Sequence, residues 1–354
     1  SIIPGMAIDK QPPFQNVLTH GFVVDGEGRK MSKSQGNVIS PAQIIKDYGA
    51  DILRMWAASS DYNEDIRISK EILSRLSEAY RKIRNTAKFI LSNLYDFDPD
   101  VDKLPYEKLR KVDQWILKVM EAASAEANSS YDLFKFHKAY KSIYDFCNEQ
   151  LSMYYLDMVK GRLYTYRADS VERRAAQTAL YEVLNYLVRA MAPILAFTAE
   201  EIWKNMPKES KEKGIASVHL LGWLTNNEDF KNFGGEYQAL IFSEVISLIP
   251  QAAAALEELR SAGKIGSSFD AQINILTNTQ DRYTFLQSFN IELCEIFKVS
   301  QVKLVFDQAN SAGLSVKVEK AEGLKCPRCW NYSLKVGSDP AHPLICDNCL
   351  KAIS

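Results

Sequence analysis

The sequence predicts a mainly α-helical protein with several domains and a metal-binding tail. Three observations lead to this fold class. Long stretches between residues 60 and 210 repeat apolar side chains every three or four positions, which is typical of helices in a bundle. Short runs rich in Val and Ile follow later and predict strands. Two C-x-x-C pairs near the end of the chain predict a zinc module.

Composition narrows the class of protein further. The 354 residues are enough for two to four domains, and 46% apolar with 25% charged residues is ordinary for a globular protein. The net charge of −1 means that a nucleic-acid site would need local clusters of cations. We see no apolar run of membrane-spanning length and no secretory leader, so we expect a cytoplasmic protein that does not bind membranes. The first residue is not Met, and we expect a cut edge there.

The N-terminal part has the pattern strand, loop, helix. "QNVLTHGFVV" (15–24) predicts a buried strand, and "DGEG" after it predicts a turn. Helix signals follow: Ser40 as N-cap before Pro41, with Gln43 completing a capping box, then Gly49 as a stop and Asp51 as the cap of the next helix.

The remaining elements suggest domain boundaries. Helices are predicted at about 68–94, 113–131, 133–164 and 170–193, the last stopped by Pro193, with a fifth capped by Thr198 and Glu201. A polar linker at 226–236 precedes a helix broken at Pro250 and strands at 272–277, 302–307 and 314–321. We therefore expect an α/β segment at 1–58, a helical bundle at 59–225, a small α+β domain at 226–323 and a zinc-binding module at 324–354.

The four cysteines of the tail are Cys326, Cys329, Cys346 and Cys349. Two tight turns with two thiolates each can supply a tetrahedral set of sulfur ligands, and four protein ligands leave no open position. The spacing thus predicts one structural zinc ion per chain, whereas disulfides or idle thiols are the alternative. His342 is a competing ligand that a closed set of four sulfurs does not need. Cys147 and Cys294 lie in apolar helical contexts and are expected in the core.

The stretch "GRKMSKSQGN" (28–37) carries Lys30 and Lys33 between two glycines. A Lys-x-x-Lys pair alone most often marks a solvated turn. Here it follows a predicted strand and precedes a capped helix. Two ammonium groups on such a loop could close over phosphate oxygens and stabilise a leaving diphosphate.

These residues also carry a resemblance. "KMSKS" (30–34) is identical to the second signature of class I aminoacyl-tRNA synthetases. The stretches "LTHGFVVDGEGRKMSKSQGNVISP", "GADILRMWAASSDY", "MAPILAFTAEEIW" and "KAEGLKCPRCWNYS" closely resemble the isoleucyl-tRNA synthetases. The resemblance implies the end of a Rossmann-type catalytic domain, a helical anticodon-binding domain, an α+β junction domain and a zinc ribbon.

The resemblance also implies roles. The family activates isoleucine with ATP and magnesium and transfers it to tRNA(Ile). Lys30 and Lys33 would be the catalytic cations, with Ser32, Lys33 and Ser34 on the ATP phosphates. The family's H-x-G-H signature and its editing domain have no match here. We therefore expect the C-terminal part of such an enzyme, monomeric and inactive alone, with most of the isoleucine site elsewhere.

Candidate RNA contacts come from local charge. Arg81, Arg84 and Lys88 share one side of a predicted helix, and Arg328 and Trp330 flank a zinc ligand. A second basic stretch holds Lys160, Arg162, Arg167, Arg173 and Arg174 among tyrosines. A solvated helix face is the ordinary meaning of such charges. A non-catalytic, zinc-containing RNA-binding module is the alternative function, whereas a P-loop enzyme lacks its G-x-x-x-x-G-K-[ST] motif here.

Overall fold

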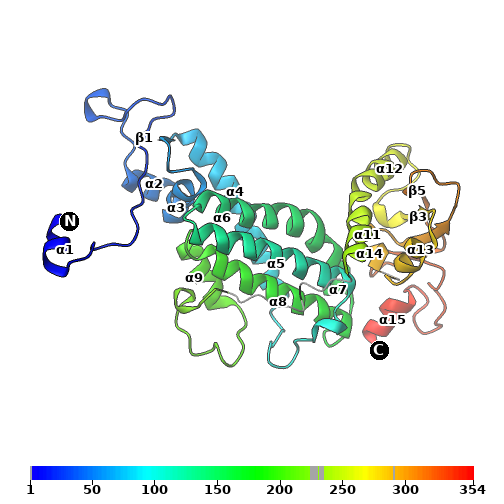
Figure 1. The fold of residues 1–354 in the computed structure, drawn as a ribbon. Coiled ribbons are helices and arrows are strands. Elements are labelled where there is room, and N and C mark those ends of the chain that lie inside the picture. The colour runs from blue at the N-terminus through cyan, green and yellow to red at the C-terminus, as the bar shows by residue number, and fades with distance from the viewer. Residues whose placement is uncertain (1, 224–229, 231–234, 290–291) are drawn as a thin grey trace.

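The computed structural model describes residues 2–223, 230, 235–289 and 292–354. Figure 1 shows an elongated, mainly helical molecule in which the N-terminal segment and the last domain lie at opposite ends of a helical bundle. Within the described ranges, none of the helices combines the length and the apolar character needed to cross a bilayer.

The N-terminal segment carries little regular structure before residue 40. It contains α1 (Ile2–Asp9), β1 (Val23–Val24), α2 (Pro41–Tyr48), α3 (Ala50–Ser59) and β2 (Ile66–Arg67). The predicted strand at 15–24 is wrong in length, because β1 covers two residues and pairs in parallel with β2 alone, Val23 opposite Ile66. Val17, Leu18 and Phe22 are exposed.

The predicted helix bounds of this segment hold, but the predicted caps do not. Ser40 and Gly49 flank α2 as expected, yet Ser40 makes no side-chain cap and Gln43 hydrogen-bonds Asp47 instead. Asp51 lies inside the first turn of α3, after Gly49. Its carboxylate faces another helix, as described below.

The bundle consists of amphipathic helices around one apolar core. They are α4 (Lys70–Asn93), α5 (Lys111–Asp132), α6 (Phe136–Asp145), α7 (Leu156–Thr165), α8 (Val171–Met191) and α9 (Ala196–Asn205). A π-helical segment, Phe146–Tyr155, joins α6 to α7. The stretch 133–164, which the sequence predicts as one α-helix, therefore contains wider π-helical turns. The helix α8 ends before Pro193 as predicted, and its buried face includes Leu180, Tyr181 and Leu184.

The α+β domain packs helices on one face of a three-stranded sheet. Its elements are α11 (Gly235–Ser247), α12 (Ile249–Ser261), β3 (Ala271–Thr277), α13 (Gln280–Gln287), α14 (Glu292–Phe297), β4 (Gln301–Phe306) and β5 (Leu314–Lys320). The strand order is β4-β3-β5, parallel on the β4 side and antiparallel on the β5 side. The predicted strands agree to within about a residue, and the helix break falls just before Pro250. The predicted linker lies almost wholly outside the described residues.

The tail is a hairpin followed by a short helix: β6 (Leu324–Lys325), β7 (Tyr332–Ser333) and α15 (Asp347–Ile353). Its buried cluster consists of three cysteines, with Cys329, Val336 and Ile345 packed around them. The module therefore has almost no apolar core of its own.

A buried ionic cluster joins the bundle to the α+β domain. Arg162 on α7 has no exposed surface and forms two 2.7 Å hydrogen bonds with the Asp113 carboxylate on α5. Glu295 on α14 lies 3.2 Å from Arg162 Nε and also pairs with Arg110. Because unpaired buried charges are costly, these groups hold the two domains in one arrangement.

Candidate functional site

The loop that carries the two predicted lysines closes on one carboxylate, that of Asp25. This buried side chain accepts hydrogen bonds from the backbone and side chain of Arg29 at 2.8 and 3.0 Å, before the lysines, and from Asn37 Nδ2 at 2.9 Å, after them. Hydrogen bonds from Asn37 and Arg29 lower the pKa of Asp25 to about 2. The group is therefore a carboxylate at neutral pH, and it ties both ends of the loop together.

The tip of the loop is a short 3-10 helix, Lys33–Gln35. Ser32 caps it, because its Oγ accepts the Gln35 N–H at 3.3 Å, and the Ser34 hydroxyl lies 3.1 Å from the Ser32 hydroxyl. Gly36 ends it with φ +69°, a left-handed conformation that suits glycine. The arrangement places Ser32, Lys33 and Ser34 on one tight turn.

Both lysines are exposed on this turn. Lys30 Nζ lies 6.0 Å from the centre of the Phe22 ring, and the Lys30 backbone bridges to Val24. Across the part of the chain that the structure describes, no acidic side chain forms an ion pair with Lys30 or Lys33. Two cations without intramolecular partners suit an anionic ligand such as a phosphate chain.

The loop is attached to a small apolar cluster of its own. Ile44, Ile52, Trp56, Ile68 and Leu73 form this second cluster, and Met31 and Ile39 from the loop pack against it. The lysines thus project from a short segment that is fixed at Met31, Asp25 and Ile39.

The four tail cysteines converge as predicted. Their sulfur atoms lie within 4.8 Å of one another, and Cys329 Sγ and Cys346 Sγ are 3.6 Å apart. Two thiolates on a tetrahedral zinc ion with Zn–S distances of about 2.3 Å lie about 3.8 Å apart. A disulfide would need about 2.05 Å, and all four are free thiols. The donor set fits one structural zinc ion, and exposed His342 is outside it.

Trp330 follows the first C-x-x-C pair in an unusual backbone conformation. Its φ is +67°, its N–H donates to the Cys326 carbonyl at 2.8 Å, and its side chain is 63% exposed. A left-handed conformation is unfavourable for a bulky residue. The ring is largely open to solvent beside the zinc loops.

Trp330 borders a cavity of about 610 Å³ between the bundle, the α+β domain and the zinc module. Aromatic and cationic side chains line it, among them Tyr164, Tyr332, Lys160 and Lys298. Cys294 also borders it and is only partly buried, whereas Cys147 is a core residue as predicted. Asp157 also borders the cavity and pairs with both lysines, so it is the aromatic lining that suits a flat ligand such as a base.

Arg328 joins the zinc module to the bundle. Its Nη1 donates to the Thr165 carbonyl at 2.6 Å and lies 3.4 Å from Cys349 Sγ. Four thiolates around one Zn²⁺ leave a net charge of −2, which the guanidinium partly offsets. Arg328 thus has a structural role besides any contact with a ligand.

The predicted cations of the first bundle helix lie on the surface. Arg81, Arg84 and Lys88 are all exposed on one side of α4, and Arg84 approaches Glu201 at 3.5 Å. They form a row of positive charge about 10 Å long, given the rise of an α-helix over seven residues.

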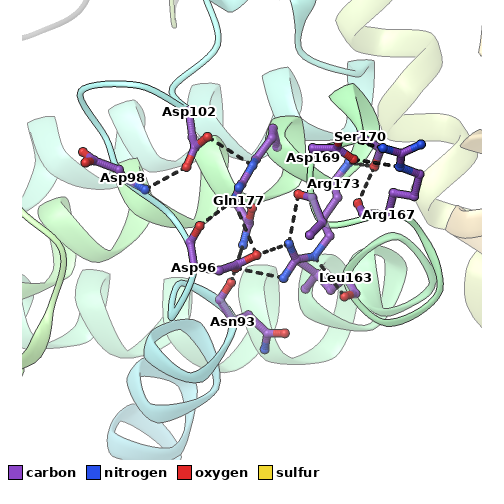
Figure 2. Close-up of polar contacts among 12 residues, drawn as sticks. Asn93, Asp96, Asp98, Asp102, Leu163, Arg167, Asp169, Ser170, Arg173 and Gln177 are labelled. Atoms are coloured by element: carbon purple, nitrogen blue, oxygen red, sulfur yellow. Dashed lines mark hydrogen bonds and ion pairs between the residues drawn. The ribbon is translucent and has the colours of Figure 1, made fainter. Parts of the chain in front are cut away.

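The cations of the second basic stretch pair with carboxylates of the same chain, some buried and some at the surface, which argues against an RNA patch there. Figure 2 shows Arg173 directed at the Asp96 carboxylate, with contacts of 2.5 and 2.9 Å, and Arg167 paired with Asp169. Burial alone would raise the pKa of Asp96, but hydrogen bonds from Arg173 and Gln177 outweigh it and lower that pKa. Arg174 joins the same network, Arg162 is buried, and Lys160 pairs with Asp157.

Comparison with known families matches three parts of the chain. Residues 1–69 match the tRNA synthetases of class I (I, L, M and V). Residues 113–275 match the anticodon-binding domain of tRNA ligases. Residues 323–352 match the zinc finger found in FPG and IleRS.

Curated relatives match the entire chain. The isoleucine–tRNA ligase of Caldanaerobacter subterraneus subsp. tengcongensis is 45% identical over 362 residues, covering 100% of this chain and 38% of the relative. The isoleucine–tRNA ligase of Syntrophotalea carbinolica is 42% identical over 360 residues with the same coverage. This chain belongs to the isoleucine–tRNA ligase family. It spans 38% of the length of these relatives.

Among solved structures, a similar one is a LeuRS of Agrobacterium radiobacter K84 in a complex with tRNA and LeuAMS. It has a TM-score of 0.50 at 23% identity over 62% of this chain and 25% of that chain. At this identity the likeness concerns the fold alone.

Two residues of the family's loop went unnoticed in the sequence. From the sequence alone, Asp25 belongs only to a predicted turn, and no pattern marks Asn37. The local signal was the spacing: an acid just before the loop and an amide just after Gly36 can meet only if the loop closes.

Proposed function

We propose that the protein to which this chain belongs activates isoleucine with ATP and magnesium and transfers it to tRNA(Ile). This chain contributes the phosphate-binding loop at 28–37 and a surface for the anticodon region of the tRNA. The observation that carries the proposal is the closed loop on Asp25, which presents two exposed lysines without an ion pair among the described residues, in a family of isoleucine–tRNA ligases.

In the first step the isoleucine carboxylate attacks the α-phosphorus of ATP, the bond to the β-phosphate breaks, and diphosphate leaves. Negative charge grows on the departing oxygens. Lys33 and Lys30 supply positive charge at that stage, while the Ser32 and Ser34 hydroxyls can donate to phosphate oxygens. In the second step a ribose hydroxyl of the tRNA attacks the isoleucyl carbonyl, and AMP leaves.

The tRNA surface extends from α4 to the zinc module. The exposed row of Arg81, Arg84 and Lys88 suits backbone phosphates, and the cavity beside Trp330 suits an unstacked base of the anticodon loop. The exposed ring of Trp330 supports this assignment, because the turn that holds its backbone on the Cys326 carbonyl leaves the side chain open to a ligand. We place Arg328 beside it as a cation that also holds the zinc turn.

The domain plan follows from the same proposal. Residues 1–58 are the end of a Rossmann-type catalytic domain, 59–225 the anticodon-binding bundle, 226–323 the junction domain and 324–354 the zinc ribbon. The alternative, a non-catalytic zinc-containing RNA-binding module, explains Trp330 and the α4 cations equally well. It gives no use to a closed loop with two free cations.

Isoleucine-dependent ATP–diphosphate exchange tests the proposal. We expect turnover by the whole protein and none by this chain alone, while fluorescence anisotropy shows tRNA(Ile) binding to this chain as a monomer. Exchange that is absent from the whole protein, with tRNA binding retained, would favour the binding-module alternative.

A further inference from the structure

Helix α3 contacts the turn between α8 and α9 through two side chains on the same face. Asp51 accepts hydrogen bonds from Phe197 N at 3.2 Å, Thr198 N at 2.8 Å and Thr198 Oγ1 at 2.6 Å. The two backbone donors are first-turn amides of α9, which has no side-chain cap from its own N-cap residue. The predicted capping box of Thr198 and Glu201 is wrong, because a carboxylate from 147 residues earlier in the chain caps this helix.

Arg54, one turn later on α3, performs the complementary task at the end of α8. Its Nε donates to the Ile194 carbonyl at 2.9 Å and its Nη2 to the Pro193 carbonyl at 2.7 Å. A carboxylate at a helix N-terminus and a guanidinium at the carbonyls that follow another helix both match the helix dipoles. Asp51 and Arg54 together therefore clamp the α8–α9 turn.

The opposite face of α3 belongs to the loop segment. Ile52 and Trp56 are buried in the second apolar cluster, against which Met31 of the loop packs. Met55, on the clamp side, is buried in the core of the bundle. The helix α3 thus lies between the bundle and the segment that carries Lys30 and Lys33.

We propose that Asp51 and Arg54 are positioning residues that fix the orientation of the phosphate loop relative to the tRNA-binding bundle. The inference rests on the proposed function. A tRNA held on the bundle must deliver its acceptor end to the catalytic site, so an error in the angle between the two parts displaces the reacting atoms. Small displacements of this kind cost large factors in rate. Activation of isoleucine without tRNA does not depend on the orientation of the bundle relative to the loop.

The test compares Arg54→Ala, Arg54→Lys and Asp51→Ala in the whole protein, with Lys46→Ala on α2 as the matched control. Lys46 is exposed and outside the clamp. Three quantities are measured: isoleucine-dependent ATP–diphosphate exchange without tRNA, kcat and KM for transfer to tRNA(Ile), and thermal unfolding. Arg54→Ala should lower kcat for transfer about tenfold, within the usual range of coupling between sites. The loss in the exchange rate should be at least fivefold smaller than the loss in kcat for transfer. The KM for tRNA(Ile) should stay within about twofold of the parent value. Arg54→Lys should recover most of the lost kcat.

Equal losses in exchange and transfer, or no loss in either, would overturn the positioning role. If the unmutated whole protein shows no isoleucine-dependent exchange, the result refutes the proposed function and not the clamp. Hydrogen–deuterium exchange of this chain then tests the clamp separately. Asp51→Ala should lower protection at 196–199 and at 41–58 while α5 stays protected. Unchanged protection at 41–58 would show that the clamp does not hold the loop segment.

Discussion

The loop at 28–37 lies at one end of the molecule and the zinc module at the other, and different forces hold these two turns in shape. Each presents an exposed side chain, Lys33 or Trp330, on a tight turn, but the loop packs on a small apolar cluster, whereas the buried cluster of the module consists of cysteines. The loop is closed by hydrogen bonds to Asp25, whereas the module is closed by four thiolates around a site for a metal ion.

Under the proposed function, the two turns have different tasks. Hydrogen bonds in an exposed loop can open and re-form during a catalytic cycle, so Lys33 can approach phosphates and withdraw. Zinc–thiolate bonds keep their geometry, so Trp330 stays where the turn places it. Four changes should separate the two ends, and they are taken here from the largest expected effect to the smallest.

Removal of zinc should have the largest effect and should stay local. Metal analysis should find one zinc per chain. Chelation should abolish protection from hydrogen exchange at 324–354 and leave α4–α8 protected, because the metal supplies about 10–16 kcal/mol of folding free energy to such modules. The variant Cys294→Ala should keep one zinc. Global loss of helical circular dichroism on chelation would contradict a locally folded module.

Loss of the Lys33 ammonium should slow isoleucine activation at the loop end of the molecule and should leave the fold intact. In the whole protein, Lys33→Ala should reduce the rate of isoleucine activation on the order of 10²-fold, with little change in KM for isoleucine, because the charge is needed as diphosphate departs. Lys46→Ala, an exposed lysine on neighbouring α2, is the control and should retain full exchange activity. Full activity in Lys33→Ala would remove this cation from the mechanism.

Trp330→Gly should weaken tRNA binding and spare the fold. A stacked base contributes about 1–3 kcal/mol, so the Kd for tRNA(Ile) should rise by about five- to 150-fold. Because glycine adopts the φ of +67° without strain, the melting temperature should not fall. Leu334→Ala, which removes a side chain that is 74% exposed on the same module, should leave the Kd unchanged. Unchanged tRNA affinity in Trp330→Gly would make the ring irrelevant to recognition.

The sequence was informative where local chemistry decides the outcome. The C-x-x-C spacing placed four sulfurs correctly, the Val- and Ile-rich runs marked β3, β4 and β5, and Pro193 and Gly49 marked helix ends. It failed where a partner lies far along the chain. Nothing local shows that Asp96 neutralises Arg173 or that Asp51 caps α9, and a run of cations looks the same whether its partners are carboxylates or RNA.

The smallest effect should come from the amide that closes the loop. Asn37→Ala removes three hydrogen bonds of the loop, yet leaves both lysines in place: Nδ2 donates to Asp25 and to the Lys30 carbonyl, and Oδ1 accepts from the Ser32 N–H. The loop should then open more often, so that trypsin cleaves this chain faster after Lys30 and Lys33. Isoleucine activation by the whole protein should fall about threefold to tenfold, as expected for a net hydrogen-bond contribution of about 1 kcal/mol.

The matched control is Asn63→Ala, whose amide donates to Asp61 at 2.8 Å elsewhere in the same segment. This substitution should change neither the cleavage rate nor the activation rate. Asn37→Asp should be worse than Asn37→Ala, because a carboxylate at position 37 cannot donate the hydrogen bond that Asn37 Nδ2 gives and would face the Asp25 carboxylate. Equal cleavage rates in Asn37→Ala and the parent chain would show that the loop is held by Met31 and Ile39 alone.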